Sequence, residues 1–545
     1  MEILQKIKNH KLWKKKYYMF LTLFSFFIIL IFSKSSPLYF INDWVDANAF
    51  FSVGKGIVHG QVPYKDLFEQ KGILLYFIHA IAYNLSETSF FGVYLLESIS
   101  FAISMILFFK ICNFYFSEKL AGVITCLTPL ILLNKDYFRA GDSAEEFVFP
   151  FVLGLLYLII SISNTGEKIK GKQFFIQGFL MGCVFWIKYT LISPWIGFFV
   201  FFGIYYLLKK DYQQVIKAVI CSLLGFVLVS IPIIMYFIIN HALHEMYFVY
   251  FKFNMMLYPK LVDQGNNINI FSRFFNTTKI FATLMWQNKI IMSILIIGSA
   301  YLLFTKAVFK QIIFKVLWIF IFVCTNYFIF YGGIPLNYYI LLDLVVLLVG
   351  FLGFCILLRD LIIRYKFQRP IVNKFLLSGV IILGIVLMIN SNDTFRDMRF
   401  FTNRPSIQVK NAENTNPNAK VPAQLEFAKY FKGKKNVTLL NYQFVDYGFS
   451  VIPNIVPNVK YFMNINIPYK VYQESMDQQN KYVEEKKTDY IVAGLKLNED
   501  VNKFGTPWLH WNYHPIAVHV QDREGNTLKY VLYEKNKLLT QKIEI

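Results

Sequence analysis

Long apolar segments separated by short polar loops fill the first 390 residues of this chain. A helix that crosses a ~30 Å hydrocarbon layer needs ~17–25 residues, and most of these segments are about that long. The pattern therefore predicts a polytopic α-helical membrane protein with about eleven spans. The predicted spans are 17–33, 90–109, 120–134, 147–163, 174–190, 193–208, 218–240, 290–305, 316–331, 338–358 and 375–390.

A shorter apolar run, 73–83, decides the topology. If this run does not cross, the loops on the N-terminal side of the membrane hold 22 Lys or Arg in 71 residues, and the loops on the other side hold 12 in 130. Cytoplasmic loops are enriched in Lys and Arg, so the N-terminus is predicted inside and the C-terminus outside. We therefore expect 73–83 to be an interfacial or re-entrant helix, which is tolerated where protein or water satisfies its backbone.

The amino-acid composition supports the membrane class. Only 16% of the residues are charged, compared with roughly 25% in soluble globular chains. The net charge of +21 lies largely in short loops between apolar segments, which indicates membrane topology and argues against a nucleic-acid partner. All six cysteines lie in or beside apolar segments, and no CxxC or HExxH spacing signals a metal site.

Beyond Asn390 the composition changes to that of a soluble chain. A polar linker over 391–420 leads into 421–545, where short apolar runs alternate with helical patterns. Residues 523–526 lie between two such runs and give a hairpin signal. These features predict a small extracytoplasmic α/β domain after a membrane domain that covers 1–390.

Ionisable residues gather in the loops that are predicted to lie outside. The first of these loops, 34–89, holds Asp43 and Asp46, which share a face if the segment is helical. A carboxylate in a cleft beside the membrane can act as a general base, although both acids could equally solvate the loop. Lys71 either contacts a phosphate as a point charge or anchors the loop at the interface.

A second acidic loop precedes the predicted span at 147–163. It carries Arg139, Asp142, Glu145 and Glu146, which form either a functional cluster or a hydrated turn. Lys188, near the outer end of another span, is open to the same two interpretations as Lys71.

The third outer loop, 241–289, could bind an anionic headgroup, but a long hydrated loop explains its composition equally well. His59 and His79 have no metal-ligand spacing, and we expect both to be structural. The candidates in the third loop are Lys252, Asn254, Tyr258, Lys260 and Arg273.

Together these motifs resemble the GT-C superfamily, polytopic glycosyltransferases that use polyprenyl-phosphate sugars. The resemblance rests on an outer-loop Asp about 25 residues before a Lys, on G-x-x-PY-x-D-x-F-x-x-KG before LLYFI, and on the acidic motif 142–147. It covers about 17–390 and is nearest to bacterial relatives of the protein O-mannosyltransferases and the lipid A aminoarabinose transferases. Two positions depart from the family pattern: Ile73 follows Lys-Gly where proline is usual, and Asn337 stands where a late motif often has His.

The resemblance implies an inverting glycosyltransferase of a bacterial plasma membrane with its active site on the extracytoplasmic face. The implied donor is a sugar on undecaprenyl phosphate or a similar lipid, and the acceptor is a surface glycan, a teichoic-acid-like polymer, a lipid or a protein. Some relatives use a divalent metal, but nothing in this sequence indicates one. The implied roles are general base for Asp46, contact with the donor phosphate for Lys71, Arg139 and Lys188, and substrate binding for Asp43, Asp142, Glu145, Glu146 and Tyr258.

Two other functions are less well supported. A lipid-linked glycan polymerase or ligase outside this superfamily would need an Arg-rich outer loop, and 241–289 has only Arg273. A transporter or flippase predicts inverted repeats and charges near the midplane in broken helices, whereas the charges here cluster at the outer ends of the spans.

Overall fold

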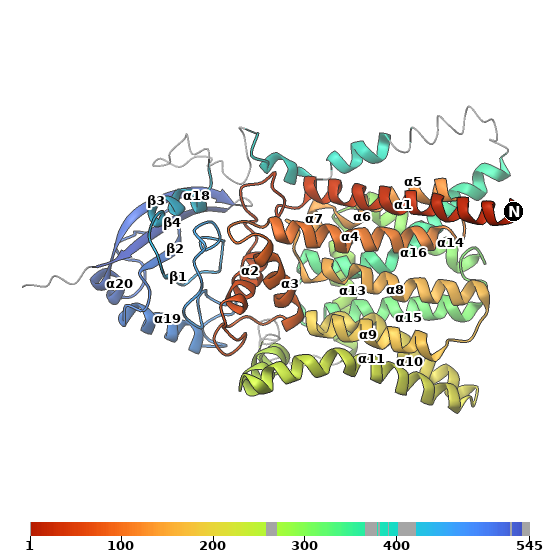
Figure 1. The fold of residues 1–545 in the computed structure, drawn as a ribbon, viewed down its shortest axis with the longest axis horizontal. Helices are drawn as coiled ribbons and strands as arrows, with labels where there is room; N and C mark the ends of the chain where they lie inside the picture. Colours follow the sequence, from red (N-terminus) through yellow and green to blue (C-terminus); the bar gives the residue numbers. More distant parts are fainter. Residues whose placement is uncertain are drawn as a thin grey trace, which may run out of the picture.

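The computed structural model describes residues 2–257, 270–365, 379, 382–390, 392–401, 421–523 and 526–536. Long helices run side by side along the long axis of the molecule, and the C-terminal domain covers one end of this bundle (Figure 1). The bundle helices are α1 (Glu2–Phe32), α4 (Phe91–Cys112), α8 (Ala144–Thr165), α9 (Gly171–Ile187), α10 (Ser193–Leu208), α11 (Tyr212–Ile239), α13 (Ile270–Trp286), α14 (Lys289–Phe304), α15 (Ile312–Ile329) and α16 (Ile340–Arg364).

Shorter helical segments connect these long helices or lie at their ends. They are α2 (Val45–Val58), α3 (Ile73–Leu85), α5 (Glu118–Cys126), α6 (Pro129–Leu132), α7 (Lys135–Phe138), η1 (Tyr189–Ile192), α12 (Leu243–Met246), η2 (Tyr247–Leu257), η4 (Asn337–Tyr339) and η5 (Asp393–Asp397).

The polytopic membrane fold is confirmed, but the number of spans is smaller than predicted. By length and composition, seven helices in the described part of the chain could cross a membrane, or eight if α13 and α14, which meet at 119°, form one bent span. Pro129 starts a separate helix, so 120–134 is not one continuous span. The segments at 174–190 and 290–305 form helices of only 17 and 16 residues, and 375–390 lies partly outside the described residues.

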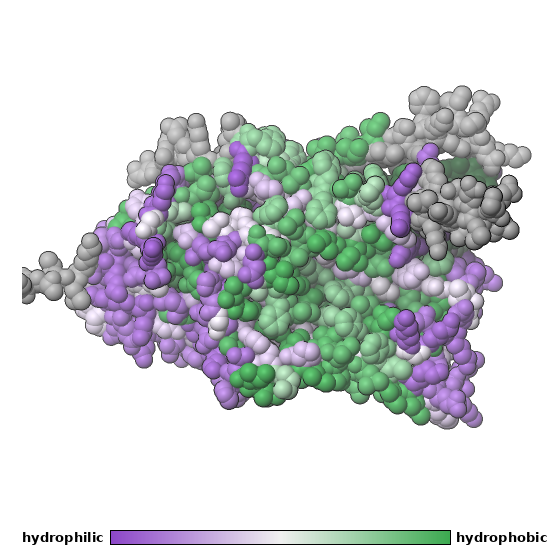
Figure 2. Space-filling view, viewed as in Figure 1, coloured by the Kyte–Doolittle hydropathy of each residue, from purple (hydrophilic) through white to green (hydrophobic). Residues whose placement is uncertain are grey.

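Apolar side chains cover the outside of the helical bundle. Figure 2 shows a hydrophobic surface over the helices, with hydrophilic surface over the C-terminal domain and at the opposite end of the bundle. Helix α11 contributes many exposed apolar residues, among them Leu223, Leu224 and Ile231, whereas the apolar residues of α16 are mostly buried. An exposed apolar belt of this size is stable when lipid covers it.

Helices α2 and α3 form a layer between the bundle and the C-terminal domain (Figure 1). With 13 residues, α3 is too short to span, as predicted for 73–83. It packs tightly on α2, because a Cβ added to Gly54 would lie 2.6 Å from the backbone carbonyl carbon of His79.

The C-terminal domain contains a four-stranded mixed sheet in the order β1-β2-β4-β3. The parallel pair β1 and β2 is connected through α19, and β2–β4 and β3–β4 are antiparallel. Strands β3 and β4 flank 524–525, which confirms the predicted hairpin. The elements are α18 (Ala423–Phe431), β1 (Leu439–Asn441), α19 (Glu474–Glu484), β2 (Tyr490–Lys496), α20 (Pro507–Asn512), β3 (Tyr513–Arg523) and β4 (Asn526–Lys535).

Buried polar contacts join the C-terminal domain to α2. Ser52 Oγ donates to Asp446 Oδ2 at 2.8 Å, and Lys55 Nζ donates to the carbonyls of Ser450 at 2.9 Å and Ile455 at 3.1 Å. Both Lys55 and Asp446 are fully buried. Burial lowers the pKa of Lys55 to about 7, and nearby carboxylates oppose part of the decrease. The helix that carries Asp46 is therefore held from the side of the C-terminal domain.

Candidate active site

Helix α2 carries Asp46 in its first turn, where the helix dipole favours a negative charge. Hydrogen bonds fix the entry to this helix: the Asn42 side chain accepts the Trp44 N–H at 3.0 Å. Asn48 Nδ2 donates to the carbonyls of Asn42 at 2.8 Å and Trp44 at 2.7 Å. The Asp46 side chain is 25% exposed. Its backbone is thus rigidly placed while its carboxylate can be reached by a substrate.

Lys71 lies next to Asp46. Its Nζ is 3.8 Å from Asp46 Oδ2 and 3.8 Å from Glu69 Oε1, and 5.6 Å from the centre of the Phe50 ring. Glu69 also accepts the Lys71 backbone N–H at 2.8 Å and the hydroxyl of Tyr76. The cation therefore stands between two carboxylates and beside an aromatic ring, and these contacts hold it in place.

Gly72 explains why Lys71 lies close to the end of α9. The Gly72 N–H donates to the Ile187 carbonyl at 2.9 Å. A Cβ at this position would be 2.0 Å from the Trp186 carbonyl oxygen, a distance that no side chain tolerates. The start of α3 is therefore attached directly to the segment that leads into Lys188.

Lys188 and two tyrosines form the other side of the site. Lys188 Nζ is 2.5 Å from Glu145 Oε1 and 3.9 Å from the centre of the Tyr339 ring. The Tyr338 hydroxyl donates to Asp46 Oδ2 at 3.2 Å. Segment η4 thus connects the Asp46–Lys71 pair with the Lys188–Glu145 pair.

Asp142 belongs to a fully buried cluster. Its Oδ1 is 2.9 Å from His79 Nε2, and its backbone N–H donates to Glu97 Oε1 at 2.6 Å and Glu146 Oε2 at 3.0 Å. Burial raises the pKa of the Asp142 carboxyl, and the contact with His79 opposes part of this increase.

The hydrogen bonds determine how many protons the His79–Asp142 pair holds. His79 Nδ1 is 2.8 Å from the Leu75 carbonyl, which can only accept, so Nδ1 carries a proton. The contact between Nε2 and Oδ1 holds one more proton, on the imidazole or on the carboxyl. The pair is electrically neutral in both arrangements, which suits its complete burial.

Asp43 lies outside the group formed by Asp46 and Lys71. It precedes α2, so the two acids do not share a helix face as expected. Lys34 Nζ contacts Asp43 Oδ1 at 3.1 Å and Asp397 Oδ2 at 2.9 Å. These ion pairs attach the loop before α2 to the segment that follows the last helix of the bundle.

Two further candidates are less closely placed. Arg139 is half-buried at the end of α7, with φ +56°, and α7 packs against η4, which carries Tyr338. Tyr258 lies outside the described residues, as does Lys260.

The structure adds residues that sequence reasoning did not assign to the site. Glu69 and Tyr76 contact the backbone of Lys71, and His79, which was expected to be structural, pairs with Asp142. Glu97 accepts the Asp142 backbone N–H, and in the sequence it is a single charged residue within the predicted span 90–109. An ionisable group within a span is itself a functional signal, and that signal could have found Glu97.

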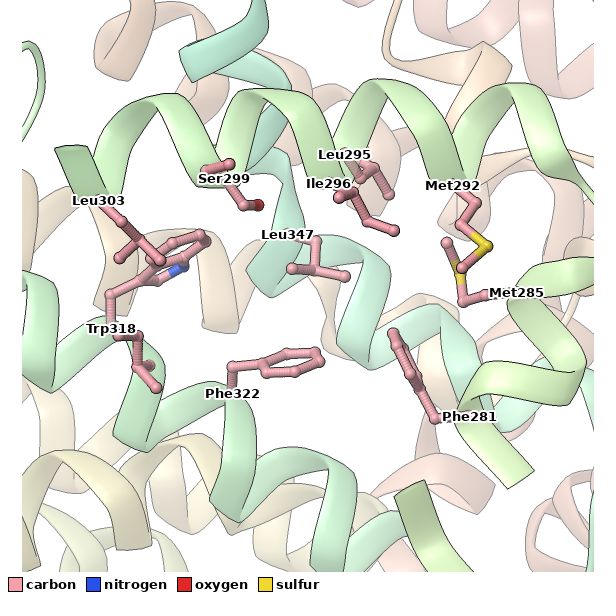
Figure 3. A pocket seen from close by; sticks show the side chains of 12 residues that line it. Phe281, Met285, Met292, Leu295, Ile296, Ser299, Leu303, Trp318, Phe322 and Leu347 are labelled. Atoms are coloured by element: carbon pink, nitrogen blue, oxygen red, sulfur yellow. The ribbon is translucent and has the colours of Figure 1, made fainter. Parts of the chain in front are cut away.

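A cavity of about 360 Å³ lies between α13, α14, α15 and α16. In Figure 3, Phe281, Met285 and Met292 lie toward one end of it and Leu303 and Trp318 toward the other. Apart from Ser299, its lining is apolar. Beside the end near Met285, the Leu284 carbonyl accepts the hydroxyl of Tyr137 on α7.

Metal ligands do not converge in this region. Within the described ranges, no group of three or more His, Cys, Asp or Glu side chains could hold a metal ion.

Residues 70–240 match a family model described as dolichyl-phosphate-mannose-protein mannosyltransferase. This range contains Lys71, Arg139, the acidic cluster and Lys188, but it ends before η4 and the C-terminal domain. No curated protein matches this sequence.

The fold is similar to that of a solved structure, the crystal structure of ArnT from Cupriavidus metallidurans bound to undecaprenyl phosphate. The two chains share 9% sequence identity with a TM-score of 0.54, over 94% of this chain and 97% of the other. Together the family match and the common fold confirm the resemblance of this chain to the GT-C superfamily of polyprenyl-phosphate-sugar glycosyltransferases.

Proposed function

We propose that this protein transfers a sugar from a polyprenyl-phosphate donor to a hydroxyl group of an extracytoplasmic acceptor, with inversion at the anomeric carbon. The observation that carries the proposal is the pair formed by Asp46 and Lys71, 3.8 Å apart, partly exposed and at the end of an apolar bundle. A base and a phosphate-binding cation at this distance are what such a reaction requires.

In the proposed reaction the acceptor oxygen attacks the anomeric carbon while the bond from that carbon to the phosphate oxygen breaks. Asp46 takes the proton of the attacking hydroxyl. The electron pair of the broken bond leaves with the polyprenyl phosphate, whose negative charge Lys71 stabilises. Tyr338 donates to Asp46 and keeps one carboxylate oxygen oriented, so the other remains available for the proton.

The remaining candidates take supporting roles in the proposal. Lys188 and Arg139 lie on the side of η4 and assist in binding the donor phosphate. Glu145 holds Lys188 in place at 2.5 Å, and Asp142 and Glu146 shape the wall behind the site. Asp43 positions the loop before α2 through Lys34, and Tyr258 is proposed, from its place in the third loop, to contact the substrate.

The apolar cavity supports a lipid donor. It runs along α14 and contains no charged side chain (Figure 3), so a prenyl chain fits its chemistry better than a sugar. The similar ArnT structure was solved with undecaprenyl phosphate bound. We place the protein in the plasma membrane of a bacterium, with the active site on the extracytoplasmic face, because the Lys-rich loops lie at the opposite end.

The test is transfer of labelled sugar from a polyprenyl-phosphate sugar in proteoliposomes. Asp46→Asn keeps the shape of the side chain and removes its basicity, so it should lower the rate by ~10²–10⁴-fold while donor binding survives. Asp43→Asn, the matched control in the same loop, should cost clearly less. If Asp43→Asn is inactive and Asp46→Asn retains near-normal turnover, the assignment of the base is wrong. If neither substitution affects turnover, the reaction centre lies elsewhere.

A further inference from the structure

A second cavity, of about 350 Å³, lies where α8 and α10 end and α15 begins. These helix ends lie at the end of the bundle opposite to the C-terminal domain (Figure 1). Part of its lining is apolar and includes Ile162, Phe202 and Phe314, which are buried. The charged side chains of its lining are Glu167, Lys168, Lys209 and Asp211. The cavity therefore combines a buried apolar part with charged groups of both signs.

Three basic loops meet around this cavity. The segments 164–173, 209–217 and 306–315 together hold nine lysines and two acidic residues. Lys310 Nζ donates to the Asn164 carbonyl at 2.9 Å and thereby joins the first loop to the third. A contact of 2.9 Å between Lys168 Nζ and Asp211 Oδ2 joins the first loop to the second. Their positive charge is thus concentrated at one place.

The two carboxylates that line the cavity already have lysine partners. Asp211 pairs with Lys168, and Glu167 pairs with Lys170 at 3.0 Å. Lys209 is exposed and forms no ion pair with any residue in the described part of the chain. The two ion pairs cancel in formal charge, so Lys209 leaves the charged groups at the cavity with an excess of one positive charge.

The surroundings of the cavity point to a lipid. Leu208 at the end of α10 is 79% exposed, and Ile312 at the start of α15 is 77% exposed. Apolar side chains that are this exposed beside a membrane bundle contact acyl chains. A cavity that binds only a water-soluble anion would gain nothing from such neighbours.

We propose that this cavity binds the headgroup of an anionic phospholipid, with its phosphate at Lys168 and Lys209. The first acyl carbons lie against Phe202 and Phe314. Lysine is a compact cation that binds phosphate as a point charge, and basic pockets between membrane helices bind anionic headgroups on the positively charged side. The site is at the opposite end of the bundle from Asp46, so it stands independently of the proposed transfer reaction.

The test measures phospholipid binding to the full-length protein after delipidation in detergent. Native mass spectrometry should show phosphatidylglycerol binding preferentially over phosphatidylcholine of the same chain length. Lys168→Gln combined with Lys209→Gln should weaken phosphatidylglycerol binding at least fivefold. The matched control is Lys172→Gln combined with Lys217→Gln, which removes the same charge from the same loops outside the cavity, and its binding should stay within twofold of the wild-type value.

Three results would overturn the proposal. One is that the cavity variant, with an unchanged unfolding temperature in phosphatidylcholine, binds phosphatidylglycerol like the wild type. Another is that the cavity and control variants lose affinity equally, which would indicate attraction by general surface charge. The third is that sn-glycerol 3-phosphate competes as well as the intact lipid, which would mean that a soluble phosphate, not a lipid, is the ligand.

Discussion

The pair formed by Asp46 and Lys71 and the pair formed by His79 and Asp142 differ in their access to solvent. Asp46 and Lys71 are partly exposed and 3.8 Å apart, which is too far for a direct hydrogen bond. Asp142 and His79 are fully buried and directly hydrogen bonded, so no substrate can come between them without unfolding the wall. We propose that the first pair serves the transfer reaction and that the second holds the wall behind it.

The largest expected effect is on turnover at the exposed cluster. Lys71→Ala removes the cation that we propose to stabilise the leaving phosphate, and the transfer rate should fall by ~10²–10³-fold at normal protein abundance. Lys71→Arg should retain part of the activity, because it keeps the charge and changes the geometry. Lys65→Ala, which alters an exposed lysine of the same loop, is the control. Wild-type turnover in Lys71→Ala would show that this lysine only anchors the loop.

At the buried cluster we expect a loss of stability. His79→Leu leaves a buried carboxyl without its partner, which costs ~3–5 kcal/mol when a buried pair is broken. Thermal unfolding in detergent should therefore shift to clearly lower temperature, while the molecules that remain folded keep their turnover. His59→Leu, at an exposed histidine, should change little. A stable but inactive His79→Leu protein would place this pair in the reaction itself.

A smaller effect is expected from pH at the contact between α2 and the C-terminal domain. Burial lowers the pKa of Lys55 to about 7, below its ordinary value near ~10.4 in the unfolded chain. Between the folded and the unfolded pKa, Lys55 is protonated in the unfolded chain and neutral in the folded protein. The contact should therefore be most stable above the unfolded pKa, and it should weaken as the pH falls toward 7. Hydrogen exchange of α2 at pH 9 and pH 7 measures this difference.

The pH effect depends on a single side chain, which provides its control. Lys55→Met fills a similar volume without a titrating group, so the difference in α2 exchange between the two pH values should shrink. An equal difference in Lys55→Met and wild type would assign the pH dependence to another group.

The smallest expected effect is that of Asp142→Asn. The asparagine amide can donate to His79 Nε2, so the pair stays neutral. Activity should therefore fall by no more than about threefold, which is a smaller free energy than the ~1 kcal/mol of a typical net hydrogen bond. The transfer assay used for Asp46→Asn gives the comparison. A loss as large as that of Asp46→Asn would remove the distinction between the two clusters.

The sequence was most informative where a local signal and the family pattern agreed. The short length of 73–83 and the charge asymmetry predicted a helix that does not span, and α3 is such a helix. The resemblance singled out Asp46 and Lys71 as site residues, but no spacing rule joins residues 25 positions apart, and their separation of 3.8 Å comes from the structure. Asp43 was grouped with Asp46 because it is near in sequence, but the helix begins after it.

Contacts between distant segments were not predictable from the sequence. His79 and Asp142 are separated by 63 positions, and neither carries a periodic signal for the other. The number of spans depended on helix ends that tertiary contacts set, as at Lys188, where the extended backbone that ends α9 also brings the cation to η4.

The hydrogen bonds of Lys55 to Ser450 and Ile455 have a consequence for how the protein is made. Their acceptors lie 395 and 400 positions after Lys55, so they reach α2 only after the ribosome has made the helices of the bundle. Until then the helix that carries Asp46 has a cation without its buried acceptors, and the nascent protein should be catalytically silent. A chain that stops within 391–420 should be inserted into the membrane but inactive, and co-expression of 421–545 is the measurement that would reveal whether activity returns.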